Sequence, residues 1–269
     1  MGAAQLTGEE RDFFHRVAET MYTNPFTVSR GDIEKRFAGA VTEFSRGREH
    51  HFGAIAPPLQ ARLAALERRG VRRLQDLGRE DRQLLRHAYL FASYHTCVER
   101  MDAHIEAQLE APDSPIAVPF AEEALAGLTE RGFTAAEAVR YFGLFFQLRR
   151  AYYFIERALV GPSASMAELR RALWTCVFTE DARIYETYLW NRMEDFSTLL
   201  LGETGNFSQH VIERTADFFT SRIWHHAETA VLAAAFHDRN EGRRPIRFRF
   251  RHTVEFFDFR ETDIDDFLM

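Results

Sequence analysis

Two long segments of the chain repeat apolar residues at the spacing of an α-helix, and this constrains the fold more than any other feature. Steps of three and four residues bring side chains onto one face of a helix. In the segment over roughly 80–110 that face carries Leu84, Ala88, Phe91, His95, Val98, Asp102, Ile105 and Leu109. In the segment over roughly 135–160 it carries Ala138, Phe142, Phe145, Arg149, Tyr152, Glu156 and Leu159. We therefore predict a mainly α fold, a multi-helix bundle with the second segment at its centre.

Start and stop signals predict further helices around these two. A capping box pairs a hydroxyl residue with a Glu three residues later at the first turn of a helix. Three such pairs, at Thr7, Thr134 and Ser165, predict helices over about 8–22, 135–160 and 166–194. Other helices are predicted over about 30–45 and from Pro57 to Gly70. The 80–110 helix is predicted to end before a set of prolines, Pro112, Pro115 and Pro119.

The character of the sequence changes near residue 195. The apolar run 196–201, followed by Gly202, is typical of a buried strand. A helix is predicted over about 207–237, and alternating Ile246, Phe248 and Phe250 predict a second strand. We therefore predict a helical, regulatory or sensor-like domain over 1–195 and a small α+β appendage over 196–269.

Composition limits the classes of function. With 46% hydrophobic residues and 25 Phe among 269 residues, the chain can bury a large core. Its formal charge of −6 argues against direct nucleic-acid binding, which needs clustered positive charge. Apolar runs stay below the ~18 residues that span a membrane. Cys97 and Cys176 form no CxxC pair, and Cys176 is expected to be buried and inert. We expect a cytoplasmic protein without a membrane partner, and a homodimer is an open alternative.

Polar residues interrupt the two apolar faces, and they are the candidate binding residues. A buried polar group without a partner costs about 1–3 kcal/mol, so Arg149, Tyr152 and Glu156 are expected to meet His95 and Asp102 across the helix interface. Such a cluster could line a ligand pocket, fix the register of the helices as a structural network, or hold a metal. The candidate pocket residues are His95, Glu99, Asp102, Arg149, Tyr152 and Glu156.

A metal site remains one of these alternatives. Helical di-iron proteins use Glu-x-x-His pairs, and this sequence contains no such pair. His95 and Glu99 are one helical turn apart and could share a metal ion, and His225, His226 and Glu228 cluster later in the chain. No cofactor is predicted, and no residue is assigned a catalytic role.

A degenerate phosphate-binding loop follows the predicted strand 196–201. The residues Gly202, Glu203, Thr204 and Gly205 match the start of such a loop. A working loop needs a further Gly and a Lys, because bare backbone amides and a cation hold the phosphates. Phe207 and Ser208 stand at those two positions, which predicts that the loop does not bind a nucleotide.

The context of this loop resembles a known family. The run from Leu189 to Gly205 resembles the entry to the AAA+ domain of bacterial activators of sigma-54 RNA polymerase. Segments 22–26 and 146–157 resemble the helical N-terminal regulatory region of these activators. Only 64 residues follow Gly205, too few for an AAA+ domain, so the resemblance implies a regulatory domain without its ATPase motor. Strand 196–201 would then lack its usual sheet and could pair with 246–257.

Three functional hypotheses follow. The first is a non-enzymatic regulatory or ligand-sensing domain related to transcription activation, which binds a small molecule or a regulatory protein. The second is a helical metal-dependent oxidoreductase, based on His95, Glu99, Asp102 and Glu106. The third is a structural or adaptor protein whose buried polar residues only fix helix register.

Overall fold

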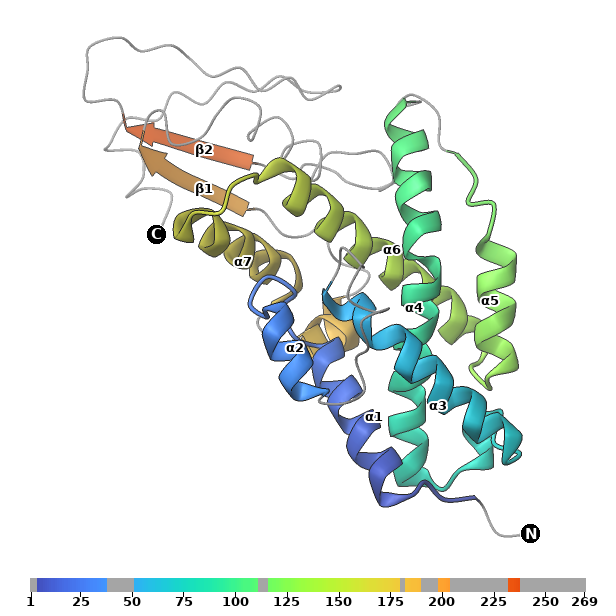
Figure 1. Cartoon of the computed structure of the whole chain (residues 1–269). Coiled ribbons are helices and arrows are strands. Elements are labelled where there is room, and N and C mark those ends of the chain that lie inside the picture. Colours follow the sequence, from blue (N-terminus) through green and yellow to red (C-terminus); the bar gives the residue numbers. More distant parts are fainter. Residues whose placement is uncertain are drawn as a thin grey trace.

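Helices dominate the structure. The computed structural model describes residues 4–37, 51–110, 116–179, 182–189, 198–203 and 232–237. The helices within these ranges are α1 (Gly8–Met21), α2 (Arg30–Arg36), α3 (Ala56–Arg68), α4 (Arg79–Glu110), α5 (Ala121–Glu130), α6 (Ala135–Ala158), α7 (Ala164–Phe178) and α8 (Ala182–Ile184) (Figure 1). Short 3-10 turns lie at His51–Ile55 and Leu74–Asp76, and a π-helical turn, Tyr185–Leu189, continues α8. The predicted helical bundle is confirmed.

The two long helices α4 and α6 cross and organise the bundle. Helices α1 and α3 pack on α4, while α5 and α7 pack against opposite ends of α6 (Figure 1). None of the helices in the described ranges has both the length and the apolar character needed to cross a membrane.

The core lies where the predicted apolar faces of α4 and α6 meet their neighbours. Ala88 and Phe91 of α4 and Phe145 of α6 are buried, as the helical spacing predicts. Leu109, at the end of the α4 stripe, remains 38% exposed because the contacts with neighbouring helices end before it. The amphipathic pattern therefore places the core correctly at these residues, but Leu109 and Glu156, at the last turns of the two predicted faces, are exposed.

The capping boxes of α1 and α6 are confirmed. Backbone amides of Glu10 and Glu137 donate to the hydroxyl oxygens of Thr7 and Thr134, each over 3.2 Å. The box predicted at Ser165 is wrong, because α7 begins two residues earlier and is capped by Ser163. Each cap satisfies an amide that the first turn of a helix otherwise leaves unpaired.

Two predicted helices are shorter than expected, and one helix was not predicted. The helix expected over 30–45 ends at Arg36. The helix expected over 166–194 stops at Phe178, because Thr179 adopts φ 65° and ψ 175°, and the chain resumes as α8 and the π-helical turn. Helix α5 follows the proline-rich stretch with only ten residues, too few for a strong periodic pattern.

Two short strands follow the helices in the chain. Strand β1 (Thr198–Glu203) pairs in parallel with β2 (Leu232–His237), in the register Thr198↔Leu232 to Glu203↔His237. The helix predicted over 207–237 is therefore wrong for its last six residues. A short apolar run such as Leu232–Phe236 suits a buried strand or a helix equally well by periodicity. The second predicted strand, 246–257, lies outside the described residues.

Candidate ligand pocket

A cavity of about 80 Å³ lies between the end of α1, α4, α6, α7 and the π-helical turn. Most of its lining is aromatic. The rings belong to Tyr22, Phe52, Phe91, Tyr94, Tyr141, Phe145, Tyr152, Trp174 and Tyr185. The remaining lining residues are Met21, Thr23, Pro25, Leu90, His95, Leu144, Leu148 and Glu186. A concave, largely apolar space with a few polar groups is the usual form of a small-molecule site.

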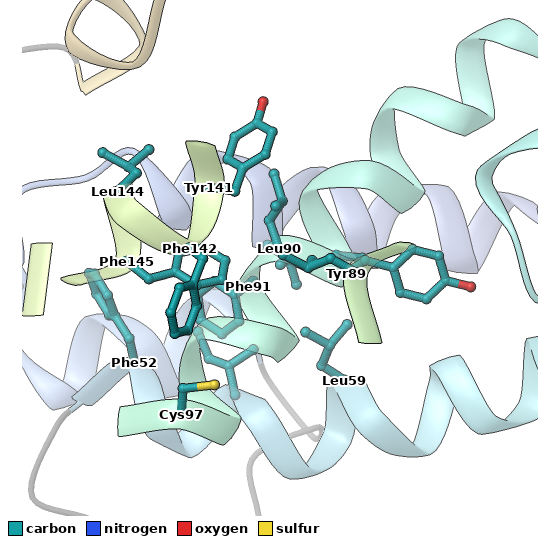
Figure 2. Packing of buried hydrophobic residues seen from close by; sticks show 14 of the residues in the cluster. Phe52, Leu59, Tyr89, Leu90, Phe91, Cys97, Tyr141, Phe142, Leu144 and Phe145 are labelled. Atoms are coloured by element: carbon teal, nitrogen blue, oxygen red, sulfur yellow. The ribbon is translucent and has the colours of Figure 1, made fainter. Parts of the chain in front are cut away.

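Helical spacing explains why α4 and α6 contribute most of this lining. On α4 the lining residues occupy positions 90, 91, 94 and 95, two neighbouring rows of one helix face. On α6 they step through 141, 144, 145, 148 and 152 in the same way. Figure 2 shows Phe91 of α4 and Phe145 of α6 with Phe52, which comes from the 3-10 turn His51–Ile55.

The rings of the lining are held by contacts with other rings. Phe26 stacks on Tyr152 with centroids 5.2 Å apart and meets Trp174 edge-on at 6.0 Å. Tyr94 meets Phe145 edge-on at 5.7 Å. Such offset and edge-to-face pairs are favourable beyond the burial of their area, so the wall of the cavity is pre-formed.

A carboxylate from the π-helical turn forms the polar part of the lining. The hydroxyls of Tyr22 and Tyr141 donate to the two carboxylate oxygens of Glu186 over 2.7 and 2.6 Å. The Arg140 guanidinium donates to the backbone carbonyl oxygen of Glu186. These bonds tie the segment 182–189 to both α1 and α6.

The tyrosine hydroxyls at this carboxylate are held in the protonated form. Burial, reinforced by the negative charge of Glu186, raises the pKa of Tyr22 well above its ordinary value. Burial and the hydrogen bond to Glu186 also raise the pKa of Tyr141, although Arg86 donates to the Tyr141 hydroxyl oxygen over 3.1 Å. Both hydroxyls therefore remain donors to the carboxylate.

A second polar contact lies in the α4–α6 interface. The Nε and Nη2 atoms of Arg149 each donate to one carboxylate oxygen of Asp102 over 2.5 Å, a bidentate ion pair. The Arg149 side chain is only 8% exposed. Burial alone lowers the pKa of Arg149, but the hydrogen bond and the charge of Asp102 more than reverse this and raise it. The predicted meeting of Arg149 and Asp102 across the interface is confirmed.

The other predicted site residues divide between the pocket and its surroundings. His95 and Tyr152 line the cavity, and the Tyr152 hydroxyl donates to Glu156 over 2.9 Å. Glu99 and Glu156 are exposed. Neither of them, nor the Asp102–Arg149 pair, is among the lining residues.

Sequence reasoning missed Glu186 and its two tyrosine partners. Tyr22 follows the last residue of α1, and Glu186 lies in a single turn after an interrupted helix, so neither continues a periodic stripe. The one available signal was Tyr141 on the predicted helix 135–160, a buried hydroxyl that needs an acceptor.

The predicted metal ligands do not converge in the part of the chain that the structure describes. No group of three His, Cys, Asp or Glu side chains there is arranged to hold a metal ion. His95 packs against the ring of Phe91, with centroids 4.3 Å apart, and Glu99 is exposed. His225, His226 and Glu228 lie outside the described residues.

The two cysteines differ in burial. Cys97 is buried, and burial raises the pKa of its thiol. Cys176 is exposed, which corrects the prediction that it is buried. The buried face of α7 is centred on Trp174 and Phe178, and Cys176 lies on the other side of that helix.

The degenerate phosphate loop is described in part. The backbone of Gly202 and Glu203 forms the end of β1, whereas Thr204 and Gly205 lie outside the described residues. Comparison of the chain with protein-family models, with curated proteins and with solved structures found no match.

Proposed function

We propose that this protein is a non-enzymatic, ligand-sensing regulatory domain, and that the aromatic pocket binds the ligand. One observation carries the proposal. The pocket is lined in part by Tyr185 and Glu186, which belong to the last turn before the chain continues toward β1. A ligand in this pocket would contact the long helices of the bundle and the segment 182–189, which leads toward β1, at the same time.

The size and character of the cavity support a binding role over a purely structural one. Protein cores contain few voids larger than a water molecule, because each void forfeits contacts among its lining atoms. This pocket, which is partly open to solvent, leaves a space of about 80 Å³ among nine aromatic rings. A small organic molecule would restore the missing contacts.

The hydrogen bonds of Glu186 suggest how binding is communicated. The segment 182–189 is tied to the bundle by Tyr22 and Tyr141, and both of these rings also line the pocket. A ligand that contacts these rings changes the free energy of the arrangement in which Glu186 is bonded to both tyrosines, relative to an arrangement in which these bonds are broken. Such a difference in affinity between two states is what allows a ligand to shift a conformational equilibrium.

The link to transcription rests on the resemblance to regulatory regions of sigma-54 activators. The segment 146–157 that carries part of this resemblance lies in α6 and supplies Leu148 and Tyr152 to the pocket. With Phe207 and Ser208 in place of the Gly and Lys of a phosphate loop, we propose that the chain acts on an activator without hydrolysing ATP itself.

A thermal-shift screen of small molecules tests ligand binding. Leu148 lines the cavity, so Leu148→Trp should fill it and remove the stabilisation by any ligand found. The matched control is Val139→Trp, which adds the same ring at a position of α6 that is 61% exposed. The proposal fails if Leu148→Trp, still folded, keeps the full ligand-induced shift.

Amide hydrogen exchange tests sensing as distinct from binding. A sensed ligand should change the exchange rates of residues 182–189 as well as those of the pocket helices, because local segments can open at a lower free energy than the whole fold. A ligand that protects α4 and α6 but leaves 182–189 unchanged would make the pocket a binding site without a regulatory output.

A further inference from the structure

We propose that the pocket takes an organic ammonium ion, an amine or a quaternary ammonium, with the carboxylate of Glu186 as its counter-charge. The inference names the ligand class of the pocket and therefore rests on the function proposed above. It follows from the charges, the rings and the hydrogen bonds of the lining.

The formal charge of the lining is negative. Of the side chains that the structure places around the cavity, Glu186 supplies a carboxylate and none is Lys or Arg. A ligand carboxylate would therefore meet the charge of Glu186. The guanidinium of Arg140 donates to the backbone carbonyl of Glu186 and that of Arg86 to the Tyr141 hydroxyl, and neither arginine lines the cavity. A ligand cation would meet a complementary charge in a space from which aromatic rings exclude much of the water.

Aromatic rings are the second part of a site for organic cations. The electron-rich face of Trp, Tyr or Phe attracts a cation within about 6 Å, and cages of such rings with an acidic group recognise quaternary ammonium ions. Trp174 and Phe145 both line this cavity, and the polar residues of its wall are mainly tyrosines.

Nearby arginines show that the rings of this region accept cations. The guanidinium carbon of Arg183 lies 5.4 Å from the ring centroid of Tyr22. That of Arg149 lies 5.2 Å from the ring centroid of Tyr152. Neither arginine is among the lining residues of the cavity. Arg149 is neutralised by its ion pair with Asp102, so it adds little repulsion for a ligand cation.

Glu186 can act as a counter-charge without losing its present partners. Each carboxylate oxygen accepts one tyrosine hydroxyl, and a carboxylate offers about four acceptor positions. A quaternary ammonium has no N–H group and acts through its charge, so it needs none of these positions. The two hydroxyls fix the carboxylate in place, and the site is charged and oriented before the ligand arrives.

The test compares three probes of nearly the same shape by isothermal titration calorimetry on the full chain. They are choline, its neutral carbon analogue 3,3-dimethylbutan-1-ol, and the anion 3,3-dimethylbutanoate. We expect choline to bind at least about tenfold more tightly than the alcohol, equivalent to about 1.4 kcal/mol. The anion is expected to bind more weakly than either.

Substitutions test whether Glu186 causes the preference for choline over the alcohol. Glu186→Gln keeps the size and an acceptor oxygen but removes the charge, and it should abolish the preference for choline over the alcohol. Glu123→Gln removes the same charge from an exposed ion pair with Arg100 and should leave the preference intact. Should Glu186→Gln not fold, Phe91→Leu is the alternative variant. It removes one ring of the lining and should weaken the binding of choline more than the binding of the alcohol.

The outcomes separate this inference from the proposed function. If the alcohol or the anion binds as tightly as choline and Leu148→Trp abolishes that binding, the ammonium inference is overturned while the pocket remains a ligand site. If no probe binds to the folded protein, the inference is also overturned, and the thermal-shift screen decides on the pocket independently. An unchanged preference in Glu186→Gln would overturn the role of its carboxylate as counter-charge.

Discussion

Two of the carboxylates that contact α6 are held in different ways. Asp102 comes from α4 and forms a bidentate ion pair with Arg149. Glu186 comes from the π-helical turn and accepts two neutral hydroxyls, from Tyr22 and Tyr141. The carboxylate of Asp102 is thus paired with a guanidinium, whereas the two carboxylate oxygens of Glu186 each accept a tyrosine hydroxyl.

The difference separates a contact that holds helices together from one that is available to a ligand. The charges of Asp102 and Arg149 cancel, and neither residue lines the cavity. Glu186 lines the cavity and joins the π-helical turn to Tyr22 and to α6. The following substitutions test this contrast.

Arg149→Met should have the largest effect on stability. It leaves the carboxylate of Asp102, with a side chain 24% exposed, without its cation in the helix interface. Breaking a buried ion pair from one side costs about 3 kcal/mol or more. Urea denaturation of the variant measures the loss in the free energy of unfolding.

The double variant Arg149→Met, Asp102→Leu is the control for this substitution. Removing both charges also removes the unpaired carboxylate, so most of the stability should return. If the double variant is as unstable as Arg149→Met alone, the loss comes from packing and not from the uncompensated charge.

Glu186→Leu should cost less, about 2 kcal/mol, because two tyrosine hydroxyls lose a charged acceptor but one of them, Tyr22, is only partly buried. The effect should be local. Amide exchange of residues 182–189 should accelerate strongly while that of α4 changes little. Uniform acceleration across α4 and α6 would mean that Glu186 supports the whole bundle as Arg149 does.

Thr134→Ala should cost about 1 kcal/mol by removing the N-cap of α6. Glu137, the other member of this capping box, also accepts a hydrogen bond from Arg86 over 2.8 Å, and Arg86 bonds Tyr141. The variant should therefore loosen the Glu186 cluster more than the distant Asp102–Arg149 pair. Chemical-shift changes larger at Arg149 than at Tyr141 would contradict this.

A pH dependence should be the smallest effect, and it concerns His87 beside the Glu186 cluster. Burial lowers the pKa of His87, and the positive charges of Arg86 and Arg183 lower it further, although Glu186 opposes this. The unfolded chain then takes up the proton first as the pH falls below about 6.5. Stability is therefore full at neutral pH and declines from about pH 6.5 down through the folded-state pKa.

His87→Phe should reduce this decline, as measured by urea denaturation between pH 7.5 and pH 5.5. The phenyl ring keeps an edge-on contact like the one His87 makes with Tyr22, at a centroid distance of 5.6 Å. Burial also lowers the pKa of His104, so His104→Phe measures that second contribution. An unchanged decline in His87→Phe would exclude His87 as its source.

The sequence predicted the parts of the molecule that repeat, and it missed those that depend on a single turn. The stripes through Phe91 and Phe145 located α4, α6 and the pairing of Asp102 with Arg149, because many residues share one helical period. Glu186 lies in five residues of π-helix after a break at Thr179, where no period can be measured. The exposure of Cys176 was missed for a related reason, since its spacing fits a helix face but not the face that α7 buries.

Of the two strands, only β1 could be predicted from the sequence. The apolar run that became β1 was recognised from its length and the glycine after it. Leu232–His237 was assigned to a helix because parallel pairing joins residues far apart in sequence, and short apolar runs do not reveal their partner.

The backbone conformation of Thr179 affects how much free energy a ligand must supply to shift the segment 182–189 between two arrangements. A threonine at φ 65° and ψ 175° occupies a region that essentially only glycine favours, at a cost of about 1–3 kcal/mol. This residue stands between α7 and the segment that carries Tyr185 and Glu186. The hydrogen bonds from Tyr22 and Tyr141 to Glu186 thus hold this segment in place beside a strained residue. Where the release of these bonds also relaxes Thr179, the free-energy difference between the tied and the untied segment is smaller than the two hydrogen bonds alone would give.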